Sequence, residues 1–170
     1  VSNVRWSYGA SKLLGEVAFY CYSKTYDIKD FNIVRLHNIY GPRMGNEHVI
    51  SQFINRYIQG GRPFNVYGGT NTRSFCYIND VLDALDKIVE NGTPGEIYHI
   101  GNEEIRIDRL AEMIFDINDE KYDFNIHPAP EGSVNRRCPN IDKLKSVGHV
   151  KSVNLEDGLR RTYEWYSRQN

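Results

Sequence analysis

Apolar residues recur every three or four positions over several stretches of the chain, which is the spacing of one face of an α-helix. Polar residues that favour helix starts precede some of these stretches: Asn79 or Asp80 before one, Asp108 before another. Taken with helix-ending glycines, the pattern predicts helices over residues 8–26, 48–59, 79–90, 108–117, 140–147 and 155–168.

Shorter runs rich in β-branched and aromatic residues lie between these helices and predict strands. The run at 31–38 is typical of a buried parallel strand, and a loop with Gly41-Pro42 and Gly45 follows it. Further strands are expected at 64–67 and 73–78, on either side of a Gly68-Gly69 turn, and at 96–101 and 122–130. Because strands alternate with helices, the fold class is α/β. No linker or repeat divides the chain, so we expect a single unit over residues 1–170.

Composition excludes several functional classes. The 170 residues suffice for one domain with a sizeable core, and the net charge of -1 gives no bulk attraction to nucleic acid or an anionic membrane. No apolar run approaches the ~20 residues that span a bilayer, and no secretory signal is present. The three scattered cysteines favour reduced thiols in a cytoplasmic protein, and the five histidines show no metal-ligand spacing.

Tyr8 and Lys12 are the first candidates for chemistry. Residues four apart on a helix are neighbours, so the expected helix places both side chains on one face. An ammonium beside a phenol favours the phenolate, which makes such a tyrosine an acid–base group for an alcohol or a carbonyl. The spacing alone is weak, because an amphipathic helix can contain an incidental tyrosine and lysine.

The neighbouring segments make the pattern far more specific. The stretch "YGASKLLGE" (8–16) resembles the catalytic helix of the short-chain dehydrogenase/reductase superfamily. In the same order as in the extended, nucleotide-sugar branch of that superfamily follow four further segments: "RLHNIYGPR" (35–43), "NVYGGTNTRSFCYINDV" (65–81), "RRCPNIDKLKSVG" (136–148) and "NLEDGLRRTYEWY" (154–166). The resemblance therefore covers nearly the whole chain and points to the NAD-dependent epimerases, dehydratases and decarboxylases of nucleotide-diphosphate sugars.

The resemblance implies a role for several residues at the redox centre. Tyr8 would be the acid–base group at the sugar hydroxyl, and Lys12 would bind the nicotinamide ribose of NAD. His37 would lie in the strand beside the nicotinamide. As a lone histidine it can equally be a packed core residue.

The resemblance also implies a substrate site for a UDP- or dTDP-linked sugar. Asn38 would face the sugar or the diphosphate, although a loop-start asparagine can instead bond its own backbone. Arg73 and Arg137 would bind the diphosphate through their guanidinium forks; the alternatives are a solvated turn charge for Arg73 and a surface basic pair for Arg137 with Arg136. Arg43 and Glu47 would line the nucleotide pocket, or be solvated.

One expected part of such an enzyme is missing from this sequence. The chain contains no glycine-rich turn of the kind that holds the NAD pyrophosphate at a helix N-terminus. We therefore expect the carboxy-terminal part of an extended enzyme: the last strands of a Rossmann-type parallel sheet with a small mixed α/β substrate-binding lobe, inactive by itself. Relatives dimerise through the helix that carries the tyrosine and lysine, so a homodimer is expected. The alternative is a catalytically silent fragment that binds a nucleotide sugar.

Overall fold

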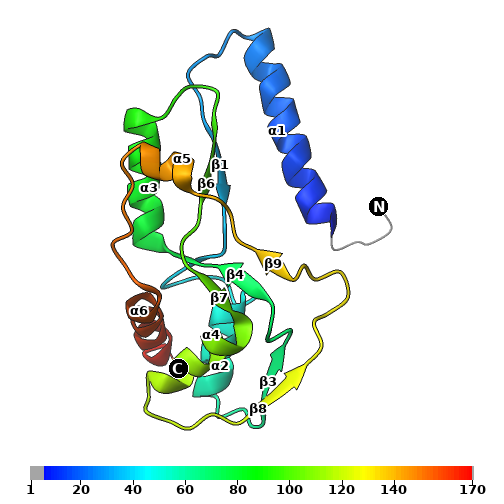
Figure 1. The fold of residues 1–170 in the computed structure, drawn as a ribbon, viewed down its shortest axis with the longest axis vertical. Helices are drawn as coiled ribbons and strands as arrows, with labels where there is room; N and C mark the ends of the chain where they lie inside the picture. Colours follow the sequence, from blue (N-terminus) through cyan, green and yellow to red (C-terminus); the bar gives the residue numbers. More distant parts are fainter. Residues whose placement is uncertain (1–5, 170) are drawn as a thin grey trace.

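The computed structural model describes residues 6–169 (Figure 1). Its elements run in the order α1 (Ser7–Thr25), β1 (Ile33–Leu36), β2 (Ile39–Tyr40), α2 (Val49–Ile58), β3 (Phe64–Tyr67), β4 (Thr72–Ser74), β5 (Cys76–Tyr77), α3 (Ile78–Asn91), β6 (Ile97–Ile100), β7 (Glu104–Arg106), α4 (Ile107–Asp116), β8 (Phe124–His127), β9 (Arg136–Arg137), α5 (Asp142–Ser146) and α6 (Leu155–Ser167). The predicted α/β alternation is confirmed, and the helices agree with the predicted ranges to within a few residues.

The upper part of the molecule in Figure 1 is built on a parallel pair of strands, β1 and β6. Helices α3 and α5 pack against β6, and the apolar side chains between them are buried, among them Ile88, Tyr98, Ile100 and Leu144. Helix α1 stands on the other side of the pair. This arrangement is that of a parallel sheet with helices on both faces.

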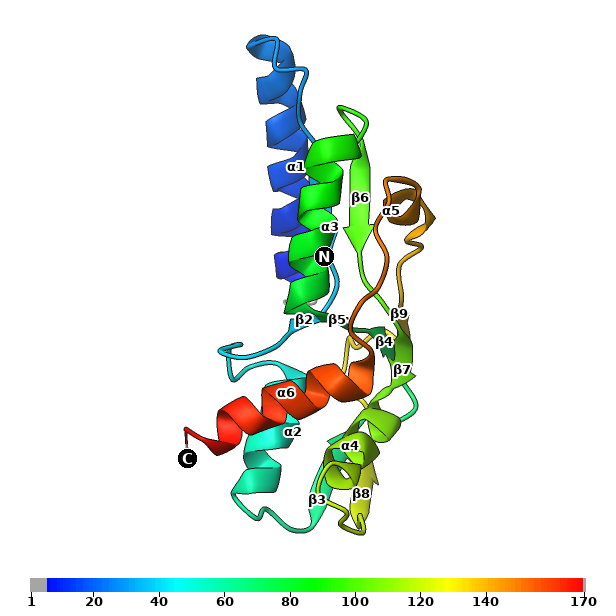
Figure 2. The same ribbon diagram turned by 90° about the vertical axis from the view of Figure 1, so that its left-hand side faces the viewer.

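The lower part is a second, mixed lobe with its own core. Helices α2, α4 and α6 lie together there, and their apolar faces enclose buried side chains such as Ile54, Phe64, Leu110, Phe115 and Leu159 (Figure 2). Strands β3 and β8 form a parallel pair, and β7, β4 and β9 form a three-stranded sheet with β4 in the middle. Strand β4 pairs antiparallel with β7 and parallel with β9.

Several strand predictions need correction. The predicted strand over 64–67 is β3, whereas that over 73–78 is two short strands, β4 and β5, and the three belong to different sheets. The Gly68-Gly69 turn leads from β3 to β4. Gly68 has a φ of +64°, and a Cβ there would meet Ala129, so the turn is held against the loop after β8. The predicted strand over 31–38 is shorter and is followed by β2, which lies in the expected loop. Strands β7 and β9 were not predicted.

The predicted helix caps were also wrong. Helix α3 begins at Ile78 and α4 at Ile107, and neither has a side-chain cap. Asp108 lies in the first turn of α4, where its carboxylate pairs with the guanidinium of Arg106. Asp80 lies in the first turn of α3, fully buried.

The Asp80 carboxylate joins three distant segments. It accepts hydrogen bonds from the backbone N–H of Ser152 at 3.0 Å and of Val153 at 3.3 Å, from the Ser152 hydroxyl at 2.5 Å, and from the Asn102 amide at 3.3 Å. A buried carboxylate needs this many donors to offset its lost hydration. Asp80 therefore ties α3 to the segment that leads into α6.

Replacing Asp80 by alanine should destabilise the fold strongly. The substitution leaves the N–H donors of Ser152 and of the buried Val153 without an acceptor, at a cost of roughly 2–4 kcal/mol. Chemical denaturation of Asp80→Ala measures the free energy of unfolding, with Asp86→Ala on the exposed side of the same helix as control. Equal, small losses in both variants would show that the Asp80 contacts contribute little.

Candidate functional site

Arg73 and Arg137, predicted from segments more than sixty residues apart, lie at paired positions of adjacent strands. Their Cα atoms are register partners in the parallel pair of β4 and β9. Side chains at paired positions point to the same face of a sheet, so both guanidinium groups lie on one side of it. The structure thus brings the two cations together, as the sequence predicted.

The side chain of Arg73 is held in place by main-chain acceptors. Its guanidinium donates to the carbonyl oxygens of Thr72 at 2.7 Å and Val134 at 2.8 Å. Arg73 is half-buried, and these bonds fasten it to the loop that precedes β9. The alternative of a solvated turn charge therefore does not describe it.

Arg136 has a different environment from Arg137. It forms a bidentate ion pair with Glu104 of β7, with both N–O distances at 2.8 Å. Glu104 also accepts the Thr72 hydroxyl at 2.5 Å, and the Arg136 pair lowers the pKa of its carboxyl. This ion pair connects the two outer strands, β9 and β7, across β4. Glu104 was not a sequence candidate, because strand β7 was not predicted.

Asn38 joins β1 to the same sheet. It has a φ of +42°, a conformation that asparagine tolerates better than most residues. Its side-chain amide donates to the Ser74 carbonyl at 2.7 Å, and its own carbonyl accepts from the Cys76 N–H. The side chain therefore bonds β4 rather than its own backbone, immediately beside Arg73 in the strand.

His37 forms a pair that the sequence analysis missed. Its Nε2 lies 2.8 Å from Nδ1 of His99, a residue of β6. Burial is the main cause that lowers the pKa of both histidines; the mutual charge and nearby Arg137 and Arg35 act in the same direction on His37.

Tyr8 and Lys12 share one face of α1, as predicted. The Lys12 ammonium lies 5.2 Å from the centre of the Tyr8 ring, and Tyr8 is 71% exposed. Figure 1 shows the N-terminal end of α1 level with the C-terminal end of β1, which leads into His37. The side chains of Tyr8 and Lys12 are both exposed.

A few contacts hold α1 to the rest of the chain. Glu16 forms a bidentate ion pair with Arg35 of β1, at 2.8 and 2.6 Å, and Tyr20 donates to the Gly95 carbonyl at 3.1 Å. Phe31 packs edge-on against Phe19 and Tyr20. Glu16 is one helical turn after Lys12, and Arg35 is two residues before His37. The ion pair therefore fixes the position of α1, and with it Lys12, along β1.

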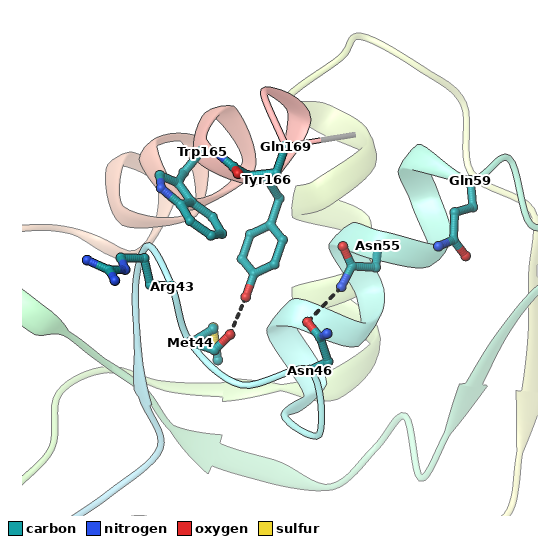
Figure 3. Close-up of a pocket in the computed structure, with 8 residues that line it drawn as sticks. All are labelled: Arg43, Met44, Asn46, Asn55, Gln59, Trp165, Tyr166 and Gln169. Carbon is teal, nitrogen blue, oxygen red and sulfur yellow. Dashed lines mark hydrogen bonds between the residues drawn. The ribbon is translucent and has the colours of Figure 1, made fainter.

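Arg43 and Glu47 both lie in the loop between β2 and α2. Arg43 borders a cleft of about 440 Å³ between the loop after β2, helix α2 and the end of α6 (Figure 3). The cleft is lined by Arg43, Met44, Asn46, Asn55, Gln59, Trp165, Tyr166 and Gln169. Neither Arg73 nor Arg137 lines it, and Glu47 is an exposed residue of the same loop. That Arg43 and Glu47 line a nucleotide pocket therefore stays a prediction.

Residues 6–169 contain neither a metal-ligand group nor a membrane-spanning helix. Within this part of the chain, no group of three or more histidine, cysteine or acidic residues is arranged to hold a metal ion. No helix among the described residues has the length and apolarity to cross a membrane.

Comparison with known proteins assigns the family. The model of the NAD dependent epimerase/dehydratase family matches residues 2–101. Human dTDP-D-glucose 4,6-dehydratase is 32% identical over 173 residues, covering 96% of this chain and 48% of the relative. UDP-glucuronic acid decarboxylase 3 of Arabidopsis thaliana is 32% identical over 160 residues, covering 92% and 46%. The chain therefore belongs to the NAD dependent epimerase/dehydratase family, as the sequence predicted.

Solved structures agree with this assignment. A dTDP-glucose 4,6-dehydratase of Streptomyces venezuelae with NAD bound superposes with a TM-score of 0.83 at 30% identity, covering 96% of this chain and 51% of that one. UDP-glucuronic acid 4-epimerase of Bacillus cereus, in complex with UDP-glucuronic acid and NAD, gives 0.87 at 27% identity, covering 96% and 53%. The chain spans about half the length of these relatives.

Acid should destabilise the fold through the two histidines. The pKa of each is lowered from 6.5 in the folded chain, so below that pH the unfolded chain binds protons that the folded chain does not. Stability is therefore complete above about pH 6.5 and falls as the pH drops through the lowered values. Thermal melting between about pH 8 and pH 5 measures this, with the variant His37→Asn/His99→Asn as control.

The control variant should show a weaker decline over the same window. The carboxyls of Glu16, Glu104 and Asp108, whose pKa values ion pairs lower, contribute only below about pH 4.5, so they do not obscure it. A wild-type melting temperature that rises on acidification would show that the two histidines do not have lowered pKa values in the folded chain.

Proposed function

We propose that this chain is the nucleotide-sugar-binding part of an NAD-dependent enzyme of carbohydrate metabolism. The enzyme oxidises a sugar hydroxyl, most often at C4, and the ketone then undergoes epimerisation, dehydration or decarboxylation. The observation that carries the proposal is the pairing of Arg73 with Arg137 across β4 and β9. Two guanidinium groups on one face of a sheet suit a diphosphate, because each presents a fork that matches phosphate oxygens.

The surroundings of the arginines support a built anion site. Main-chain carbonyls orient Arg73 before any ligand arrives, which reduces the entropy lost on binding. Asn38 is fixed to the same strand and offers an amide, which both donates and accepts. In this proposal the diphosphate lies over the two arginines and the sugar extends towards Asn38. The substrate is a UDP- or dTDP-linked sugar, as in relatives of both kinds.

Tyr8 and Lys12 supply acid–base chemistry in this proposal. NAD, when bound, accepts the hydride from the sugar carbon. Tyr8 takes the proton of the sugar hydroxyl as the hydride leaves, and returns it when the hydride comes back. The Lys12 ammonium, 5.2 Å from the centre of the Tyr8 ring, would donate to the nicotinamide ribose.

The residues present fit only the nicotinamide end of NAD. Lys12 and Tyr8 are exposed on α1 and His37 follows β1, but the chain has no glycine-rich turn for the pyrophosphate. A segment outside these 170 residues holds the pyrophosphate in this proposal. Helix α1 also exposes Leu13, Leu14 and Val17, a surface that such a segment or the α1 of a second copy would cover in a cytoplasmic homodimer.

A second candidate function is a catalytically silent module that binds nucleotide sugars. The observation in its favour is the high exposure of Tyr8, together with the missing pyrophosphate turn. Absorbance or mass analysis of the purified protein separates the two candidates, because only the enzyme retains NAD. The diphosphate site is common to both.

Removing Arg137 should weaken UDP binding about tenfold or more, because a charged hydrogen bond contributes roughly 1.5–3 kcal/mol. Arg73→Ala should weaken it at least as much. The matched control is Arg136→Ala, one residue away but paired with Glu104. Isothermal titration calorimetry measures all three variants. An Arg136→Ala loss as large as that of Arg137→Ala would contradict the diphosphate assignment.

Tyr8→Phe should abolish turnover in the intact enzyme while UDP affinity stays unchanged. Loss of a positioned acid–base group typically lowers the rate roughly 10³-fold. The control is Tyr22→Phe on the same helix, which is exposed and packs on Tyr26. Rate measurements with a nucleotide sugar and NAD decide the matter; retained turnover in Tyr8→Phe would exclude the assigned role.

A further inference from the structure

The function proposed above places His37 beside the nicotinamide but gives no part to His99, the residue hydrogen-bonded to it. His37 follows β1 and His99 lies in β6, so the pair bridges the two parallel strands where β1 ends. The His37 N–H also donates to the Ile100 carbonyl at 2.9 Å, which fixes the backbone of His37 against β6. With both the backbone and the ring of His37 bonded to β6, its imidazole has one defined position.

The bond between the rings restricts their protons. Nε2 of His37 and Nδ1 of His99 are 2.8 Å apart, so one carries the proton and the other accepts it. A second proton on the facing nitrogen would break this bond, because two N–H donors would then oppose each other. The two rings therefore titrate as one unit, and the tautomer of each depends on the other.

The charged groups that act on the pair come from four elements. Arg35 of β1, Arg137 of β9 and Lys143 of α5 are cations, and Glu16 of α1 is the anion. Glu16 is already paired with Arg35. Half-burial and the excess of cations both oppose uptake of a proton, and they lower the pKa of the two rings. The pair is therefore neutral at neutral pH.

We propose that His99 is a positioning residue for His37, and that the pair sets the charge beside the nicotinamide. The second half of the inference rests on the proposed function. The oxidised nicotinamide ring is cationic and the reduced ring is neutral. A neutral pair accepts either form, whereas a protonated pair repels the oxidised form. Weak acid would then shift the site from NAD⁺ towards NADH.

Nuclear magnetic resonance of the imidazole nitrogens tests the pair in the chain itself. In the wild type we expect scalar coupling across the N–H···N bond and two-step titration at both rings. In His99→Asn the coupling disappears and His37 titrates in one step. The control His48→Asn, an exposed histidine, leaves His37 unchanged. Independent one-step titrations of the two rings in the wild type would overturn the inference.

Binding measurements on the intact enzyme, which includes the segment that holds the pyrophosphate, test the charge. On acidification through the titration of the pair, NAD⁺ affinity should fall roughly tenfold, the scale of one nearby charge. The affinities of NADH and ADP-ribose, which lack the ring charge, should change little. In His99→Asn, acidification should no longer produce the same NAD⁺-specific loss over that pH range.

The outcomes separate this inference from the proposed function. If ADP-ribose and NAD⁺ bind with the same pH dependence, the pair does not set the charge, and the proposed function stands. If none of the three ligands binds, the proposed cofactor site falls, and the charge role falls with it. The magnetic resonance experiment still decides whether His99 positions His37.

Discussion

The pairing of the three-residue strand β4 on both of its edges is the constraint on which the site depends. On one edge it bonds β9 in parallel, which places Arg137 beside Arg73; on the other it bonds β7 antiparallel. The carbonyl of Ser74 at its end also accepts the amide of Asn38. Residues from three distant segments thus meet because they bond the same short strand. Without β4, nothing in the described chain would bring Asn38 near Arg137.

Helix α1 contrasts with this well-braced sheet. Its attachment consists mainly of the Glu16–Arg35 ion pair, the Tyr20 hydroxyl and the packing of Phe31. The ion pair is only half-buried, and a single such pair contributes little to stability, so α1 depends on burial of its apolar side chains. Those side chains are largely exposed in the described structure; the side chain of Leu14, for example, is 68% exposed. The proposed catalytic pair is therefore carried by the element with the fewest internal contacts, whereas the proposed substrate residues lie on a fixed sheet.

Local patterns predicted the helices well, and tertiary pairing explains what was missed. The spacing of apolar residues located α2 at Val49–Ile58 to within one residue, because a helix face is a local property. Strands β7 and β9 are two or three residues long and mostly exposed, so they have no apolar alternation, and only their distant partner β4 defines them. Asp80 was expected to cap a helix, but its carboxylate accepts hydrogen bonds from the backbone N–H groups of Ser152 and Val153 instead.

The candidate site shows the same division. Family resemblance named Asn38, Arg73 and Arg137, and the sheet gathers them. The partner of His37 could not be named, because His99 becomes its neighbour only through the register of β1 and β6. Resemblance of their loop also named Arg43 and Glu47. Arg43 borders a cleft that neither Arg73 nor Arg137 lines.

Mapping UDP on the chain by backbone amide resonances tests the central claim most directly. The account predicts that saturating UDP shifts the amides of β4, β9 and Asn38, that inorganic pyrophosphate reproduces the shifts in β4 and β9, and that uridine does not. Shifts confined to the cleft beside Arg43 and Tyr166, or no shifts in a folded chain, would contradict it.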